Sequence, residues 1–306
     1  MLIHSITQAV QDTPLLELAH LEVPNGNKIY GKCEYLNPAG GLKDRTAIYM
    51  IAQAQKKGIL QANSVIIEAT AGNTGLGLAL ATLHTPYKLI LVIPEHFSKQ
   101  KQSLIRALGA EVINTKEELG IQGALDKADA LLKEIPNSLS LGQFENLDNP
   151  KAHYIHTARE IYAELDGKID YFIAGAGSGG SFSGIAKYLK EQNPKIQAVL
   201  CDPLGSHIGG FSAQDEGICS HIEGIGNKVV PKTMDSTLVD RVLKIGDKEA
   251  IEGVKMLSLK EGVLAGISSG ACLMAALKLA NQIQDSHIVT IFADRLERYI
   301  DEREIF

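Results

Sequence analysis

Short apolar runs alternate with amphipathic stretches along almost the whole chain of 306 residues. This alternation is typical of a parallel β-sheet with crossover helices, because such strands are buried on both faces and each helix on one. The length fits about two domains of roughly 150 residues each. The pattern therefore predicts an α/β protein with two lobes, each built on an open twisted sheet.

The boundaries of the expected elements follow from the apolar periodicity and from helix start and stop signals. The expected strands are 28–33, 64–68, 88–93, 111–114, 171–174, 196–201 and 287–292. The expected helices are 43–57, 74–83, 99–108, 122–133, 152–165, 182–191, 248–261 and 269–282.

Glycine-containing loops follow two of these strands and open helices. The loop 70–75 reads Thr-Ala-Gly-Asn-Thr-Gly, and 175–181 reads Gly-Ala-Gly-Ser-Gly-Gly-Ser. Small residues at such a junction let backbone N–H groups and a helix N-terminus face an anion. The first loop is predicted to bind a carboxylate and the second a phosphate. A Thr or Asn cap on a glycine turn is the alternative for 70–75.

Lys43 stands behind the turn Asn37-Pro38-Ala39-Gly40-Gly41, at the start of an expected helix. An amine presented in this way can form a Schiff base with a carbonyl cofactor. A surface lysine is the alternative if no other motif supports a cofactor. Ser268 and Ser269, in Gly266-Ile267-Ser268-Ser269-Gly270, precede another expected helix, where either hydroxyl can serve as an N-cap.

The loop 175–181 also satisfies the dinucleotide-binding fingerprint, with glycines at 175, 177 and 180. Asp202 lies about 20 residues further on, where that fingerprint requires an acidic residue. An NAD-dependent dehydrogenase is therefore a remote alternative. It leaves Lys43, the loop 70–75 and Ser268 without a role.

Composition excludes several classes of partner. The net charge is −6, and no basic stripe of the kind that binds nucleic acid is present. The four cysteines are scattered and have no histidines at zinc-ligand spacing, so no metal site is expected. Neither a signal segment nor a membrane-spanning apolar run is evident, which predicts a cytoplasmic protein without a membrane partner.

The segment 204–228 lacks clear periodicity and is rich in glycine. Long loops inside α/β enzymes are usually binding or lid elements, and a disordered insertion is the alternative.

Taken in order, the motifs at 37–45, 70–75, 175–181 and 266–270 resemble the fold-type II family of pyridoxal 5'-phosphate (PLP) enzymes, in particular its cysteine synthase and cystathionine β-synthase branch. The likeness runs from Asp12 to Tyr299. It implies a tryptophan synthase β-like fold and a homodimer. It also implies a smaller mobile substrate-binding lobe at 44–150 and a larger PLP-phosphate-binding lobe formed by 1–43 and 151–306.

The resemblance also implies roles for individual residues. Lys43 would bind PLP and move the Cα proton, Asn73 would bond the ring hydroxyl, and Ser268 would face the pyridine nitrogen. The phosphate would be held by Gly177, Ser178, Gly179, Gly180 and Ser181. The substrate carboxylate would be held by Thr70, Ala71, Gly72, Asn73, Thr74 and Gln143. Many relatives have Ser in place of Ala71, which leaves the preferred leaving group in doubt.

The function implied is β-replacement, in which O-acetyl-L-serine and sulfide give L-cysteine. Two alternatives share the chemistry: cystathionine β-synthesis with homocysteine, and β-elimination from cysteine that releases hydrogen sulfide. The partners expected are thus a small amino acid and a sulfur nucleophile.

Overall fold

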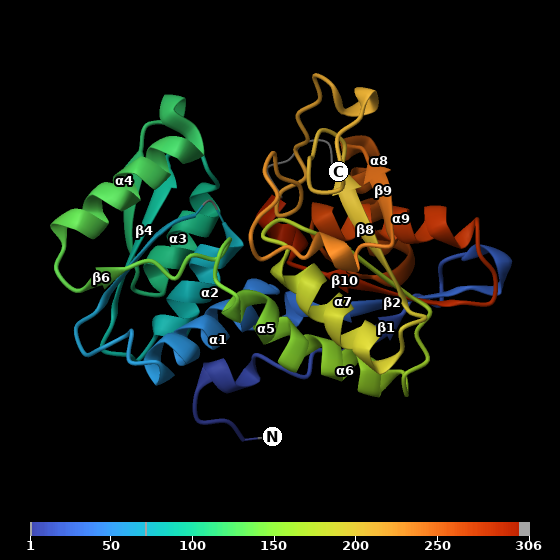
Figure 1. Ribbon diagram of the computed structural model, residues 1–306, viewed down its shortest axis with the longest axis horizontal. Coiled ribbons are helices and arrows are strands. Elements are labelled where there is room, and N and C mark those ends of the chain that lie inside the picture. Colours follow the sequence, from blue (N-terminus) through green and yellow to red (C-terminus); the bar gives the residue numbers. More distant parts are fainter. Residues whose placement is uncertain (1, 71, 300–306) are drawn as a thin grey trace. The chain divides into compact units, whose positions relative to one another are not determined.

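The computed structural model describes residues 2–70 and 72–299, which form two compact units (Figure 1). Unit 1 comprises Met1–Val10 and Asn37–Asp148, and unit 2 comprises Gln11–Leu36 and Asn149–Phe306. Each unit has its own β-sheet and its own hydrophobic core. The sequence-based boundary differs, because it assigned 1–10 and 37–43 to the larger lobe and 149–150 to the smaller one. That the smaller lobe is mobile and binds substrate stays a prediction.

The sheet of unit 1 has four parallel strands in the order β5-β4-β3-β6. The strands are β3 (Val65–Ala69), β4 (Lys88–Pro94), β5 (Glu111–Thr115) and β6 (Ser138–Leu139). The helices are α1 (Lys43–Lys56), α2 (Asn73–Thr82), α3 (Lys99–Ala107) and α4 (Gly120–Glu134). The chain steps from β3 to β4 to β5 and then returns to the other side of β3. This reversal creates a topological switch point at the carboxyl ends of β3 and β6, where open α/β sheets bind ligands.

Both faces of this sheet are buried. Ile66 points to one face, where it joins a core with Met50 of α1 and Leu76 of α2. Its neighbour Ile67 points to the other face and packs with Leu131 of α4. Alternate residues of one strand thus contact different helices, which explains the continuous apolar runs in the sequence.

The sheet of unit 2 has the strand order β1-β2-β10-β7-β8-β9, in which only β1 is antiparallel to its neighbour. The strands are β1 (Leu15–Glu17), β2 (Lys28–Cys33), β7 (Tyr171–Gly175), β8 (Gln197–Pro203), β9 (Arg241–Ile245) and β10 (His287–Phe292). The helices are α5 (Asp148–Ile155), α6 (Thr157–Glu164), α7 (Gly180–Gln192), α8 (Asp247–Glu261) and α9 (Ile267–Ala280). Here the winding reverses between β7 and β10.

Helices cover the sheet of unit 2 on two sides (Figure 1). On one side, Ile173 and Val199 belong to a core that includes Leu273 of α9 and Val254 of α8. Phe172, whose side chain alternates with that of Ile173, instead contacts Phe182 of α7, with ring centroids 5.9 Å apart. The α/β class and the paired sheets predicted from the sequence are confirmed.

Every expected strand and helix is present within a few residues of its predicted ends, except that the helix expected at 152–165 is two helices. His156, with φ −108° and ψ −77°, separates α5 from α6. Three strands, β1, β6 and β9, were not expected. All three lie at sheet edges, and β1 and β6 have only three and two residues. Short, partly exposed edge strands have no continuous apolar run, so periodicity does not reveal them.

In the part of the chain that the structure describes, no helix is both long enough and apolar enough to cross a lipid bilayer.

Gly31 on β2 provides a test of this packing. A Cβ atom there would lie 1.9 Å from Cε2 of Phe292 on the neighbouring strand β10. We expect Gly31→Ala to lower the free energy of unfolding by about 1–3 kcal/mol through overpacking. Adding Phe292→Leu should recover part of that loss, which a double-mutant cycle in urea measures.

Gly246→Ala is the control for this experiment, because its Cβ would meet only ordinary contacts, the nearest at 3.4 Å. A Gly31→Ala protein as stable as the wild type would contradict the proposed packing.

Candidate active site

Lys43 is the first residue of α1, and the turn before it is fixed by hydrogen bonds. The Gly40 N–H donates to the Asn37 carbonyl at 2.8 Å, and the Ala39 N–H donates to Asp44 Oδ2 at 2.7 Å. Asp44 is buried in the first turn of α1, where a carboxylate suits the positive end of the helix dipole. The turn and the helix together hold Lys43 in a defined position.

Burial lowers the pKa of Lys43 to about 8, well below the value of an ordinary lysine. A substantial fraction of its amine is therefore neutral near physiological pH, which is the nucleophilic and proton-accepting form. The helix that carries Lys43 also touches α2 closely, since a Cβ on Gly77 would lie 2.7 Å from the Lys43 carbonyl oxygen.

The loop between β3 and α2 contains most of the predicted carboxylate-binding residues. Thr70 is buried and its N–H donates to the Val92 carbonyl, and α2 begins at Asn73. The N-cap residue, Gly72, has no side chain to cap the helix, so the first-turn N–H groups are suited to an anionic ligand. Ala71, also predicted to bind substrate, lies outside the described residues.

Gln143 lies beside this loop, and its binding of substrate stays a prediction. The Thr74 hydroxyl donates a hydrogen bond of 2.6 Å to Gln143 Oε1, and both side chains are buried. The bond joins the segment after β6 to the helix after β3, at the switch point of the unit 1 sheet.

Glu68, at the end of β3, was not recognised as a site residue from the sequence. Its Oε1 accepts hydrogen bonds from the Leu141 N–H (2.5 Å), the Gly142 N–H (3.0 Å) and the Ser140 hydroxyl (2.9 Å). Burial raises its pKa, and these three hydrogen bonds oppose that rise. Glu68 thus fixes the turn that positions Gln143. Its one sequence signal is an acidic residue that directly follows the apolar run Val65–Ile67.

The loop 176–179 of unit 2 leads from β7 into α7. Gly179, the N-cap residue, has φ +81°, and a Cβ there would lie 2.5 Å from Cβ of Met234. At Gly177 a Cβ would lie 2.3 Å from the Gly224 carbonyl oxygen. Only glycine fits these positions, and the first backbone N–H groups of α7 have no capping side chain from Gly179. The loop is therefore suited to a phosphate group.

Ser178 is anchored by two neighbouring segments. Its hydroxyl accepts a hydrogen bond of 3.0 Å from the Asn149 amide, and its carbonyl accepts one from the Thr233 hydroxyl. Both contacts hold the glycine loop in one conformation.

Ser268 and Ser269 lie in the first turn of α9, and the structure distinguishes them. The Ser269 hydroxyl is fully buried and accepts a hydrogen bond of 3.0 Å from the Ala293 N–H. No residue within the described ranges hydrogen-bonds to the Ser268 hydroxyl. One turn further along α9, Cys272 lies near the backbone of Gly175, so this part of α9 lies beside the end of β7. Ser268 is thus the hydroxyl available to a ligand.

Asp202, which the dinucleotide interpretation assigned to a ribose, is fully buried. Its Oδ2 accepts hydrogen bonds from Lys244 Nζ at 2.8 Å and from the Gly209 N–H at 3.0 Å. Lys244 also contacts the Ser206 carbonyl at 2.7 Å and Asp215 Oδ1 at 3.1 Å. The Asp202 carboxylate thus holds the segment 204–228 in place through hydrogen bonds. It is not available to bind a ribose, which argues against the remote NAD-binding alternative.

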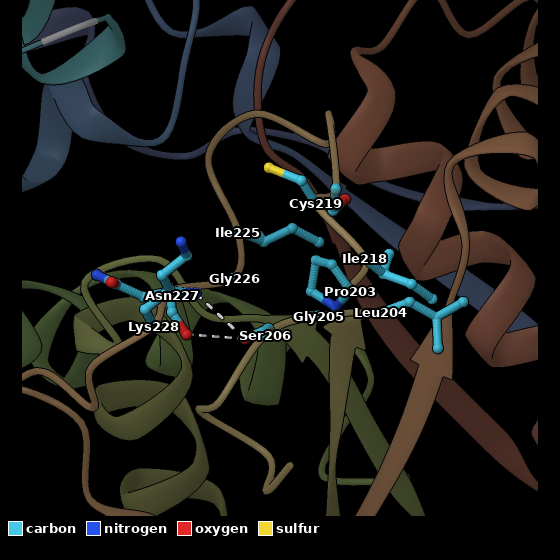
Figure 2. Close-up of a pocket in the computed structure, with 11 residues that line it drawn as sticks. Pro203, Leu204, Gly205, Ser206, Ile218, Cys219, Ile225, Gly226, Asn227 and Lys228 are labelled. Atoms are coloured by element: carbon cyan, nitrogen blue, oxygen red, sulfur yellow. Dashed lines mark hydrogen bonds between the residues drawn. The ribbon is translucent and has the colours of Figure 1, made fainter. Parts of the chain in front are cut away.

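The segment 204–228 follows β8 and contains a cavity of about 170 Å³ (Figure 2). Ser206 and Asn227 hold its two sides together, since the Asn227 N–H donates to Ser206 Oγ at 3.1 Å. The lining residues are Pro203, Leu204, Gly205, Ser206, Ile218, Cys219, Ser220, Ile225, Gly226, Asn227 and Lys228. Apolar walls with hydroxyl, amide and amine groups suit a small polar ligand.

The predicted site residues thus fall into two groups. Lys43, the loop 70–74 and Gln143 lie in unit 1, whereas the loop 177–181 and Ser268 lie in unit 2. No cluster of metal-ligating side chains occurs among the residues the structure describes.

Known proteins are similar to this chain over nearly its whole length. The family model "Pyridoxal-phosphate dependent enzyme" matches residues 6–294. O-acetylserine dependent cystathionine beta-synthase of Bacillus subtilis (strain 168) is 43% identical over 302 residues, which cover 98% of this chain and 97% of that protein. Cysteine synthase of Helicobacter pylori (strain ATCC 700392 / 26695) is 41% identical over 305 residues, covering 99% and 98%.

A solved structure agrees with the present one over nearly its whole length. The crystal structure of a hydrogen sulfide-producing enzyme from Fusobacterium nucleatum gives a TM-score of 0.91 at 40% identity and covers 98% of this chain and 100% of that chain. Because the family model and the relatives each match almost the entire chain, this protein belongs to the PLP-dependent enzymes, in their cysteine synthase and cystathionine β-synthase branch, and its cofactor is PLP.

Proposed function

We propose that this protein catalyses β-replacement on O-acetyl-L-serine with sulfide, forming L-cysteine. One observation carries the proposal. Unit 1 combines a lysine of lowered pKa with a glycine-capped helix N-terminus, on two helices that touch at Gly77. An amine and a carboxylate-binding loop are the two groups required to handle one small amino acid.

The residues present fit PLP. In the proposal, Lys43 forms the covalent bond to its aldehyde, and the backbone of Gly177–Ser181 holds its phosphate. The fit rests on the glycine loop: a Cβ at Gly177 or Gly179 would collide with Gly224 or Met234, so glycine is required for the loop to pack in this conformation. The first amides of α7 receive no side-chain cap from Gly179 and can donate to a phosphate. Asn73 would bond the ring hydroxyl. Bound PLP supplies an electron sink for the negative charge that develops at the substrate Cα.

The side chains around the cofactor would then direct the chemistry. The substrate carboxylate is held by the first-turn amides of α2 and by Thr74 and Gln143, which orients the Cα–H bond. The neutral amine of Lys43 accepts the Cα proton and returns a proton at the end of the cycle. Ser268 presents a neutral hydroxyl to the ring nitrogen, which does not favour ring protonation as a carboxylate would.

The cavity of the segment 204–228 supports a second candidate, in which homocysteine is the acceptor. Lys228, Ser206 and Asn227 line it with groups that can bind an amino-acid carboxylate. The Bacillus subtilis relative is named an O-acetylserine dependent cystathionine beta-synthase. The Fusobacterium nucleatum enzyme is named as a hydrogen sulfide-producing enzyme. Cleavage of cysteine, which releases hydrogen sulfide, would use the same first half-reaction. The homodimer and the cytoplasmic location expected from the sequence belong to this proposal as well.

Product analysis tests the proposal. Purified protein is mixed with O-acetyl-L-serine, L-serine or L-cysteine, each with sulfide, with homocysteine or alone, and the products are identified by mass spectrometry. L-cysteine from O-acetyl-L-serine and sulfide is the expected main product. Cystathionine as the sole product would replace cysteine synthesis by the second candidate.

The pKa of Lys43 predicts how cofactor-free protein takes up PLP. The rate of uptake should rise with pH through about 8, because only the neutral amine attacks an aldehyde and burial lowers the Lys43 pKa to about 8. Lys43→Ala should take up no covalently bound cofactor and lose at least roughly 10²–10⁴-fold in turnover. Absorbance spectra measure uptake, and circular dichroism checks the fold. A rate that rises only above pH 10 would refute the assigned amine.

Ser268 and Ser269 should respond differently to substitution. Ser268→Asp should slow β-replacement and shift the absorbance of the bound cofactor, because a carboxylate favours a protonated ring nitrogen. Ser269→Ala should instead lower the free energy of unfolding by about 0.5–1.5 kcal/mol, because the partly buried Ala293 N–H loses its acceptor. Steady-state rates, spectra and urea unfolding separate the two effects. If both variants changed rates, spectra and stability in the same way, Ser268 would have only a structural role at the start of α9.

A substitution of Lys244 should affect only one of the two half-reactions. Lys244→Met removes the cation that joins Asp202, Asp215 and Ser206, so the segment 204–228 should loosen. We expect the KM for the sulfur acceptor to rise several-fold, with the first half-reaction on O-acetyl-L-serine unchanged. Ala71→Ser is the matched comparison, since it should alter the ratio of rates for O-acetyl-L-serine and serine instead. Single-turnover kinetics without acceptor isolates the first step.

The opposite pattern, in which Ala71→Ser shifts acceptor selectivity as strongly as Lys244→Met, would show that this division is wrong.

A further inference from the structure

Lys101 is a buried lysine in unit 1, and it lies at the N-terminal end of α3, where a positive charge does not stabilise the helix. Only 2% of the residue is exposed. It lies in the first turn of α3, where the positive end of the helix dipole disfavours an ammonium group. Its backbone N–H donates to the N-cap hydroxyl of Ser98 at 3.3 Å. Burying a charge in this position costs free energy, so its location calls for a role outside α3.

The buried face of α3 meets the carboxylate-binding loop. A Cβ on Gly72 would lie 3.8 Å from Lys101 Nζ. A Cβ on Gly75 would lie 3.1 Å from the terminal methyl of Ile105, which is one helical turn after Lys101. Residues at this spacing share one helix face, so Lys101 and Ile105 both pack against the start of α2. The ammonium therefore lies beside Gly72, the N-cap residue that precedes α2.

We propose that Lys101 is a positioning residue whose positive charge strengthens the attraction of the 70–74 loop for the α-carboxylate of the amino-acid substrate. The inference rests on the proposed function, because it assigns that loop to a substrate carboxylate. The first-turn amides of α2 supply only partial charges. The full positive charge of Lys101 beside Gly72 adds to the positive electrostatic potential that these amides create. Its effect is large because the ammonium group is shielded from water.

The test measures binding to the PLP-loaded enzyme without turnover. L-alanine has the α-carboxylate but no leaving group, and L-alaninamide lacks the negative charge. Their dissociation constants are measured by calorimetry for the wild type, Lys101→Met, Lys101→Arg and Lys99→Met. Lys99 is exposed on the same helix and is the matched control.

We expect Lys101→Met to bind L-alanine roughly tenfold to a hundredfold more weakly and L-alaninamide as the wild type does. Lys101→Arg should restore most of the affinity because it keeps the charge, and Lys99→Met should have no effect. Circular dichroism verifies folding, and Lys101→Gln repeats the test if the Met variant does not fold.

Two results would overturn the inference: unchanged L-alanine binding in Lys101→Met, or an equal loss for both ligands, which would indicate a purely structural role. A wild type that binds neither ligand would instead refute the proposed function on which the inference rests.

Discussion

The site depends on one structural constraint, the helix N-terminus that begins with glycine at the end of a central strand. In unit 1 Gly72 precedes α2 after β3, and in unit 2 Gly179 precedes α7 after β7. Each of these strands borders the point where its sheet reverses winding, so the loops lie where α/β sheets bind ligands. Because glycine offers no capping side chain, the first amides of both helices are suited to anions. The proposal that one unit binds a carboxylate and the other a phosphate rests on this shared geometry.

Buried charged residues hold other segments of the candidate site in place, namely residues 140–142 before Gln143 and the segment 204–228. Glu68 accepts three hydrogen bonds from residues 140–142, and Lys244 joins two buried aspartates to the segment 204–228. Burial alone would raise the pKa of Asp215, but hydrogen bonds from Gly205, Ser212 and Lys244 together lower it. Such groups are costly to desolvate, and the cost is offset only when several hydrogen bonds form at once. These segments are thereby fixed by contacts that the ligands themselves do not make.

The sequence predicted the parts of the site that depend on local structure. The loops at 70–75 and 175–181, and the position of Lys43 at a helix start, follow from strand–loop–helix patterns that a short window contains. Glu68, Lys101 and Lys244 were missed, because their roles arise from contacts with segments distant in the chain or from burial on a helix face. Residues 99–103 are all polar, so the sequence gives no sign that Lys101 is buried. The same reason explains the unit boundary at Asn37, which depends on long-range packing.

We propose that Lys43 is the residue that binds PLP. Borohydride reduction of the PLP-loaded protein fixes the cofactor to its lysine, and peptide mass spectrometry then identifies that residue. We expect one labelled peptide, which contains Lys43, with the label absent from Lys43→Ala. A label on any other lysine, such as the buried Lys101, would show that Lys43 does not bind the cofactor.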